Sequence, residues 1–156
     1  MIARRVMIAG LVAATVAVPA AFLAGQDARA DTPDVFARRG VAIGGVDPVA
    51  YFTQGRAAEG RAEHSLMWKG VEWRFSSAEH RAAFEADPEA YAPQYGGYCA
   101  YAVSEGYTAK IDPEAWTNHD GRLYLNYSRS VRDRWSRDIP GRIARGDANW
   151  PGVLSR

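Results

Sequence analysis

The single cysteine carries the most distinctive chemistry in this chain of 156 residues. Cys99 has no partner for an intramolecular disulfide, because the sequence holds no second cysteine. A lone thiol serves as a small buried hydrophobe, as a soft metal ligand or as a nucleophile. Gly96 and Gly97 precede it and allow a close approach of the backbone, whose N–H groups can then stabilise a thiolate.

Tyrosines surround Cys99 in the sequence, at positions 95, 98 and 101. Their rings can shield a reactive site from water, but for Tyr95 and Tyr101 we expect ordinary places in the core. His64 and Met67 lie on one predicted strand, and their odd separation points them to opposite faces. His119 adjoins a predicted turn, where we expect it to be exposed.

A first β-hairpin is predicted where the runs 64–68 and 71–75 flank Lys69 and Gly70. Ser76 and Glu79 then have the spacing of a capping box, which predicts a helix that Asp87 and Pro88 end. Pro88 can start a short helix of its own.

A second hairpin is predicted over residues 115–127, with its turn at Asp120 and Gly121. Ser128 is a suitable N-cap for a helix through Trp135 that Pro140 interrupts, and the stretch 143–150 is expected to pack Trp150 against the domain. The acid pairs 87/89 and 112/114 each bracket a proline, which we interpret as helix starts rather than as catalytic acids. The chain is therefore predicted to be a small α+β single domain with two β-hairpins and several short helices.

The first 30 residues have the order of a cleavable signal peptide. Arg4 and Arg5 precede an uncharged apolar stretch, and the segment 28–30 reads Ala-Arg-Ala. We expect export to the periplasm or the medium, by the general secretory route or by the twin-arginine route that the two arginines also resemble. Residues 31–39 are expected to be a flexible lead-in, and residues 40–156 a domain with a C-terminal helical extension.

Charge excludes two classes of partner. The chain has 19 basic and 18 acidic side chains; without residues 1–30, which hold three arginines and one aspartate, 16 and 17 remain, a net charge of −1. Such a balance gives no electrostatic footprint for nucleic acid or for an anionic membrane surface. We therefore expect neither partner once the signal peptide is removed.

The segment WRFSSAEHRAAFEADPEAY, with Asp47 and Pro48 upstream, resembles the YHS domain. Its aromatic, serine and proline positions fit that family's pattern over roughly 45 residues. The family's cysteines, which underlie its association with copper and other soft metals, are replaced here by Ala50, Ser76 and His80. Of these three residues, only His80 keeps a side chain that binds copper or zinc. An exposed position in the first helical turn is the alternative reading of His80.

The run GGYCAYAVSEGYTA, followed by DPEAW and LYLNY, resembles an exported bacterial branch of YHS proteins. Some members of that branch carry selenocysteine at the position of Cys99. The resemblance implies that Cys99 is present for the reactivity or softness of its sulfur.

Three functions follow as expectations. The first is a soft-metal binder, with copper(I) as its tentative cofactor and with Cys99 and His80 as ligands, helped by Met67 or by a partner's side chain. The second is a thiol redox protein whose Cys99 reacts with an external thiol partner. The third is a non-catalytic interaction module with an inert Cys99. An enzyme is not the leading expectation, and pairing of two chains through Cys99 stays open.

Overall fold

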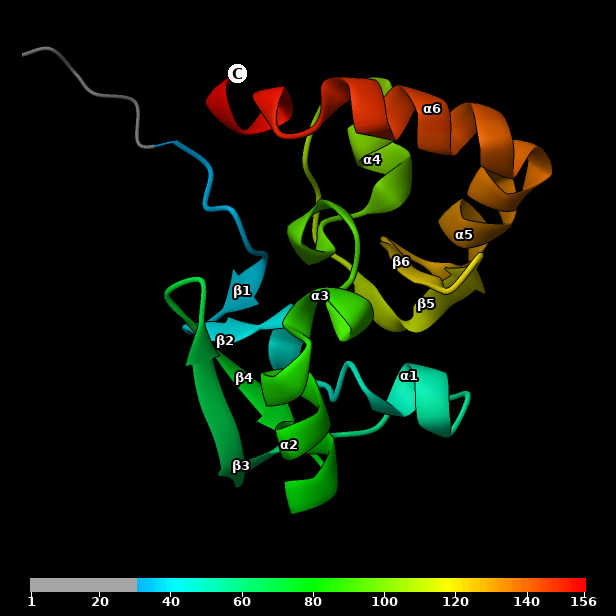
Figure 1. The fold of residues 1–156 in the computed structure, drawn as a ribbon. Helices are drawn as coiled ribbons and strands as arrows, with labels where there is room; N and C mark the ends of the chain where they lie inside the picture. The colour runs from blue at the N-terminus through cyan, green and yellow to red at the C-terminus, as the bar shows by residue number, and fades with distance from the viewer. Residues whose placement is uncertain (1–30) are drawn as a thin grey trace, which may run out of the picture.

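The structure is a computed structural model that describes residues 31–156 of the chain (Figure 1). Its strands form one sheet of four strands and one of two. The strands are β1 (Ala37–Arg38), β2 (Val41–Ala42), β3 (Arg61–Trp68), β4 (Val71–Phe75), β5 (Asp112–His119) and β6 (Arg122–Asn126). The α-helices are α1 (Ala50–Thr53), α2 (Ala78–Ala86), α3 (Pro88–Tyr91), α4 (Ala100–Glu105), α5 (Arg129–Trp135) and α6 (Ile139–Asn149). Short 3₁₀ turns occupy Ile43–Gly45 (η1), Tyr95–Gly97 (η2), Ser136–Asp138 (η3) and Gly152–Ser155 (η4).

The four-stranded sheet has the order β1-β2-β4-β3, in which only the β2–β4 pair is parallel. The predicted first hairpin is confirmed: β3 and β4 turn at Lys69 and Gly70, which both have positive φ. Alternation along β4 buries Trp73 and Phe75 against Phe84 of α2. Trp73, Phe75 and Phe84 belong to the first of two clusters of buried apolar side chains, which we call the lower core.

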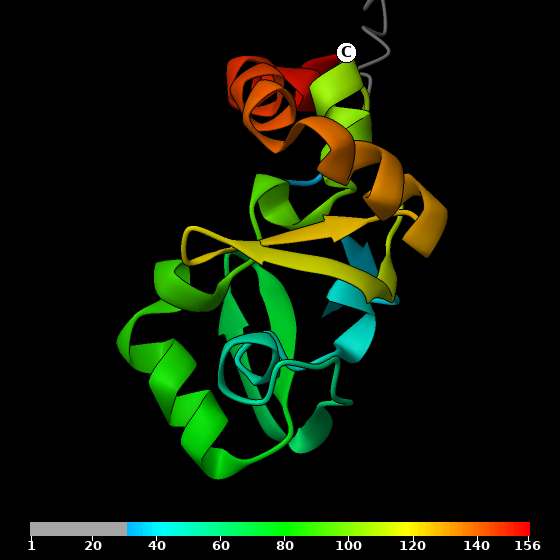
Figure 2. The ribbon, with the colours of Figure 1, turned by 90° about the vertical axis from the view of Figure 1, so that its right-hand side faces the viewer.

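The second hairpin, β5–β6, lies between the lower sheet and the helices α4, α5 and α6 (Figure 2). Strand β6 is buried on both faces. Leu123 and Leu125 belong to the lower core, whereas Tyr124 packs on Trp135 of α5 in an upper core. The hairpin therefore joins two clusters of apolar side chains into one domain, and the predicted α+β class with two hairpins is confirmed.

Three local predictions need correction. The N-cap of α2 is Ser77, which accepts the His80 N–H, and not Ser76, which bonds to Asp47 instead. The Asp112–Glu114 pair starts no helix, because it lies at the irregular beginning of β5. Pro140 does not interrupt a helix; it stands in the first turn of α6, where a missing N–H costs nothing.

The segment 31–39, expected to be a flexible lead-in, is held in place. Val35 is buried, the Phe36 N–H donates to the Gly96 carbonyl at 2.9 Å, and Ala37–Arg38 form strand β1. The predicted signal peptide lies in residues 1–30, outside the described part of the chain. Over residues 31–156, no helix has the length and apolar character needed to cross a membrane.

Candidate functional site

Cys99 stands at the first turn of α4, after the glycine pair predicted to bring the backbone close. Gly96 and Gly97 have φ of +61° and +83°, a region that L side chains rarely adopt. A Cβ on Gly97 would meet Ile43 Cγ2 at 2.5 Å. The Cys99 N–H donates to the Ala109 carbonyl at 3.0 Å. The start of α4 is therefore held by the packing of Gly97 before it and by the segment that follows the helix.

The sulfur of Cys99 is buried, with 1% of the residue exposed, and its neighbours are polar. The Tyr127 N–H donates to Sγ at 3.3 Å, and the thiol lies 3.6 Å from Asn126 Oδ1. The same Oδ1 accepts the Tyr101 N–H at 3.0 Å. Because that bond requires an oxygen, it fixes which way the carboxamide of Asn126 is turned.

The other end of that carboxamide has no partner. Asn126 is fully buried, and Nδ2 is one of two buried side-chain nitrogens without a hydrogen bond among residues 31–156; the second is Trp135 Nε1. A buried donor left unpaired costs about 1–3 kcal/mol. The carboxamide therefore contacts Cys99 and Tyr101 through its oxygen, while its nitrogen has no protein partner among residues 31–156.

Burial raises the pKa of the Cys99 thiol, while the backbone N–H groups of Ala102, Tyr127 and Tyr101 act in the opposite direction. Burial is the larger effect, so the resting group is a neutral thiol at pH 7. The amides nevertheless form a set of donors directed at any negative charge that develops on the sulfur.

One residue that contacts the buried sulfur reaches the surface. Tyr127, whose N–H touches Sγ, is itself 46% exposed. Cations stand over the two neighbouring rings: Lys110 Nζ lies 5.5 Å from the centre of the Tyr127 ring, and the guanidinium groups of Arg142 and Arg134 lie 4.1 and 5.7 Å from that of Tyr101. Arg142 also pairs with Glu105.

A second polar cluster surrounds Asp47, whose side chain is fully buried. Its Oδ1 accepts the N–H groups of Val49 at 2.8 Å and Ala50 at 3.3 Å. Its Oδ2 accepts the Ser76 N–H at 2.9 Å, the Ser76 hydroxyl at 2.6 Å and His80 Nδ1 at 2.5 Å. The three residues at the cysteine positions of the YHS pattern, Ala50, Ser76 and His80, thus meet around one carboxylate.

His80 is therefore not an exposed first-turn residue, since only 14% of its side chain is accessible. Its Nε2 lies 3.2 Å from Thr53 Oγ1, and that hydroxyl is also 3.1 Å from the Val49 carbonyl oxygen. Carboxylate, imidazole and hydroxyl follow one another in a row that the sequence did not indicate. We interpret the row as structural: the buried Asp47 binds His80 of α2, and the Thr53 hydroxyl at the exposed end is also bonded to its own helix.

Cys99 and His80 are not brought together. Helix α2, with His80, packs on β3, β4 and α3, whereas α4, with Cys99, packs on α6, β6 and α5. The two helices lie at opposite ends of the molecule in both views (Figures 1 and 2). A metal site using both side chains of one molecule therefore does not fit this arrangement.

Met67, the expected helper ligand, is 67% exposed on β3. His119 lies beside Asp120 in the second hairpin turn, as expected, with 34% of its side chain accessible. The described residues 31–156 contain no group of three or more His, Cys, Asp or Glu side chains that could hold a metal ion.

The tyrosines near Cys99 divide into two kinds. Tyr95 is buried, as predicted, and so is Tyr98. Tyr101 is only half-buried, with the guanidinium group of Arg142 over its ring. Sequence reasoning missed Asn126 altogether and used Asp47 only for the resemblance to the YHS domain, without a role for its carboxylate.

Comparisons of the chain with protein-family models, with curated proteins and with solved structures found no match. The resemblance to the YHS domain therefore rests on the sequence pattern alone.

Proposed function

We propose that this chain is an exported thiol redox protein in which a hydroperoxide oxidises Cys99 and a small external thiol reduces it again. The observation that carries the proposal is the set of backbone donors directed at the sulfur: the Tyr127 N–H at 3.3 Å and the N–H groups of Tyr101 and Ala102 at the start of α4. An oxygen atom added to Sγ would be an acceptor among donors. These surroundings therefore suit a sulfenic acid better than a thiol.

The same donors argue against a copper(I) site at Cys99. Copper(I) requires further soft ligands, such as thioether or imidazole groups. The groups that contact Sγ are instead backbone N–H and a carboxamide, and the positive ends of N–H dipoles oppose a cation at that point. Copper binding by Cys99 and His80 remains a prediction, and it is one outcome of the test below.

The proposed cycle balances without a second cysteine. The Cys99 thiolate attacks one peroxide oxygen, the O–O bond breaks, and an alcohol or water leaves with the proton, so that the sulfur is oxidised to sulfenic acid. An external thiol then attacks that sulfur, water leaves, and a mixed disulfide forms. A second external thiol releases reduced Cys99 and carries away the disulfide of the two small thiols.

The charges near the surface favour a particular class of reductant. Lys110 and Arg134 lie over the rings of Tyr127 and Tyr101 and form no ion pair with a residue in the range 31–156. They place positive charge next to Tyr127 and Tyr101, whose backbone N–H groups are directed at Sγ. A thiol that carries carboxylates is therefore expected to react faster than one that carries an ammonium group.

The test is oxidation of the purified protein by hydrogen peroxide, followed by trapping with dimedone and intact mass spectrometry. We expect one dimedone adduct at Cys99 and none in Cys99→Ser. Reduction of the oxidised protein is then timed with 3-mercaptopropionate and with cysteamine at equal thiolate concentration. A rate at least fivefold higher with 3-mercaptopropionate would support the role of Lys110 and Arg134.

Two results would overturn the proposal. Failure of Cys99 to form the adduct while the protein stays folded would favour the interaction module with an inert thiol. Tight binding of copper(I) that is lost in both Cys99→Ser and His80→Ala, without any sulfenic acid, would favour the metal binder.

A further inference from the structure

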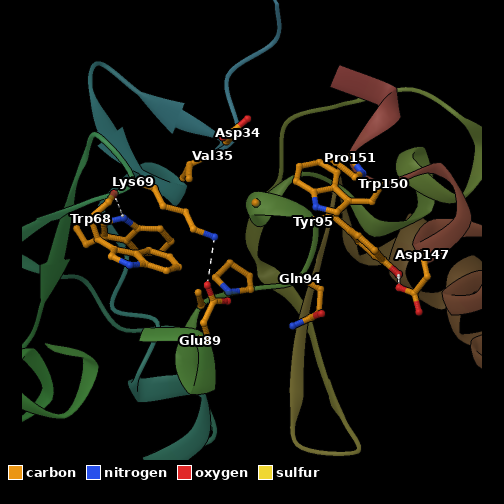
Figure 3. A pocket seen from close by; sticks show the side chains of 14 residues that line it. Asp34, Val35, Trp68, Lys69, Glu89, Gln94, Tyr95, Asp147, Trp150 and Pro151 are labelled. Carbon is orange, nitrogen blue, oxygen red and sulfur yellow. Dashed lines mark hydrogen bonds and ion pairs between the residues drawn. The ribbon is translucent and has the colours of Figure 1, made fainter. Parts of the chain in front are cut away.

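A cleft of about 380 Å³ separates the first hairpin from the end of α6, away from Cys99 (Figure 3). Its volume lies within the range of small-molecule sites. Residues from widely separated parts of the chain line it, among them Asp34, Trp68, Lys69, Glu89, Asp147 and Trp150. It thus combines indole rings with three carboxylates and one ammonium group.

One wall of the cleft already holds a cation. Lys69 Nζ lies 4.4 Å from the centre of the Trp68 ring and 3.2 Å from Glu89 Oε1. An ammonium group placed over an indole face and beside a carboxylate is stabilised by both. This wall therefore shows, with the protein's own side chain, the chemistry that the cleft can offer.

The opposite wall has the same pair of groups without the cation. Trp150 is partly exposed and packs against Tyr95, with ring centres 6.1 Å apart. The Tyr95 hydroxyl donates to Asp147 Oδ1 at 3.0 Å and so holds that carboxylate at the cleft. Among the residues that line the cleft, Lys69 and Glu89 form the ion pair, which leaves Asp147 and Asp34 without a cation there.

We infer that the cleft binds a small organic cation, with its ammonium group on the Trp150 face beside Asp147. Asp147 and Asp34 have no ion-pair partner among the residues that line the cleft, which favours a positively charged ligand, and the indole face favours one with alkyl groups on nitrogen. The inference is independent of the redox proposal, because Cys99 does not line this cleft.

The probe is choline, and its matched control is 3,3-dimethylbutan-1-ol, which has the same shape without the charge. Binding to the purified protein is followed through the indole N–H resonances in ¹H–¹⁵N spectra. We expect saturable shifts of the Trp150 resonance with choline, and an affinity at least fivefold higher than for the neutral alcohol. Cys99→Ser should bind choline as the parent protein does.

Two variants locate the site. Asp147→Asn keeps an oxygen for the Tyr95 hydroxyl and should weaken choline binding at least threefold, whereas Asp133→Asn, on the exposed face of α5, should leave it unchanged. Trp150→Leu should abolish binding, provided that its thermal unfolding remains cooperative. Equal affinity for choline and the neutral alcohol, or undiminished binding in Asp147→Asn, would overturn the inference.

Discussion

Asp47 and Asn126 are both fully buried polar side chains, yet their surroundings differ. The two oxygens of Asp47 accept five hydrogen bonds from Val49, Ala50, Ser76 and His80. Asn126 uses its oxygen for Tyr101 and Cys99 but leaves Nδ2 unpaired. A complete network stabilises one structure, whereas an incomplete one is compatible with a second chemical state. We therefore expect the first cluster to stabilise the fold and the second to serve the proposed reaction of Cys99.

The largest effect is expected at Asp47. Asp47→Ala leaves the Ser76 and Val49 N–H groups and His80 without their acceptor, so the free energy of unfolding should fall by about 3–5 kcal/mol. Urea denaturation measures it. Asp87→Ala, which removes the exposed N-cap of α3, is the control and should cost about 1 kcal/mol. A loss below 1 kcal/mol for Asp47→Ala would remove the distinction between the two clusters.

Asn126 should matter less for stability and more for reactivity. Asn126→Leu removes the acceptor of the Tyr101 N–H but also removes the unpaired Nδ2, so we expect a loss of only about 1–2 kcal/mol. Oxidation of Cys99 by hydrogen peroxide should slow about tenfold, equivalent to about 1.4 kcal/mol, because the sulfenic acid loses the polar carboxamide that contacts the sulfur. An unchanged oxidation rate would return Asn126 to a purely structural role.

The pH dependence of Cys99 alkylation gives a third comparison. Burial raises the thiol pKa, so the thiolate fraction at pH 7 is small and should rise about tenfold per pH unit until that pKa is reached. Iodoacetamide labelling, timed from pH 7 to pH 9, measures it. A rate that levels off below pH 8 would mean that the amides outweigh burial.

The stability of the fold should change with pH in the opposite direction to the alkylation rate. The folded state holds the proton of Cys99 more strongly than the unfolded chain, and the same is true of the buried tyrosines Tyr51, Tyr95 and Tyr98, whose pKa values burial also raises. Stability is therefore full below the unfolded-state pKa values of about 8.5 and 10, and it is lost as the pH rises above them. Thermal unfolding at pH 7, 9 and 10.5 should show a falling midpoint.

The smallest effect is expected at the exposed end of the Asp47 cluster. Thr53→Val removes a hydroxyl near His80 Nε2 that water can replace, so the free energy of unfolding should change by less than about 0.5 kcal/mol. The same denaturation experiment measures it, with Thr53→Ser as the control that restores the hydroxyl. A loss above 1.5 kcal/mol would mean that Thr53 also belongs to the stabilising network around Asp47.

Local signals predicted much of the fold and little of the candidate sites. The pairs Lys69–Gly70 and Asp120–Gly121 identified both hairpins, because tight turns need residues that adopt positive φ. Ser128 and Pro88 placed two helix starts correctly for the same kind of local reason.

The sites depend on contacts between distant parts of the chain. Asp47 meets His80 across 33 positions, and Asn126 reaches Cys99 across 27. Nothing near Asn126 in the sequence indicates that its carboxamide is buried. The cleft likewise joins the first hairpin with the end of α6, a juxtaposition that only the packing of the two cores creates.

The hydrogen bond from the Thr32 N–H to the Leu154 carbonyl, at 3.0 Å, brings the first and last described segments side by side. A short peptide could connect residue 156 to residue 31 and let the chain be opened elsewhere, for instance at the Asp120–Gly121 turn. Such a circular permutant should keep the native fold. During synthesis, by contrast, the segment that leads into β1 must wait for the final residues before its last contact can form.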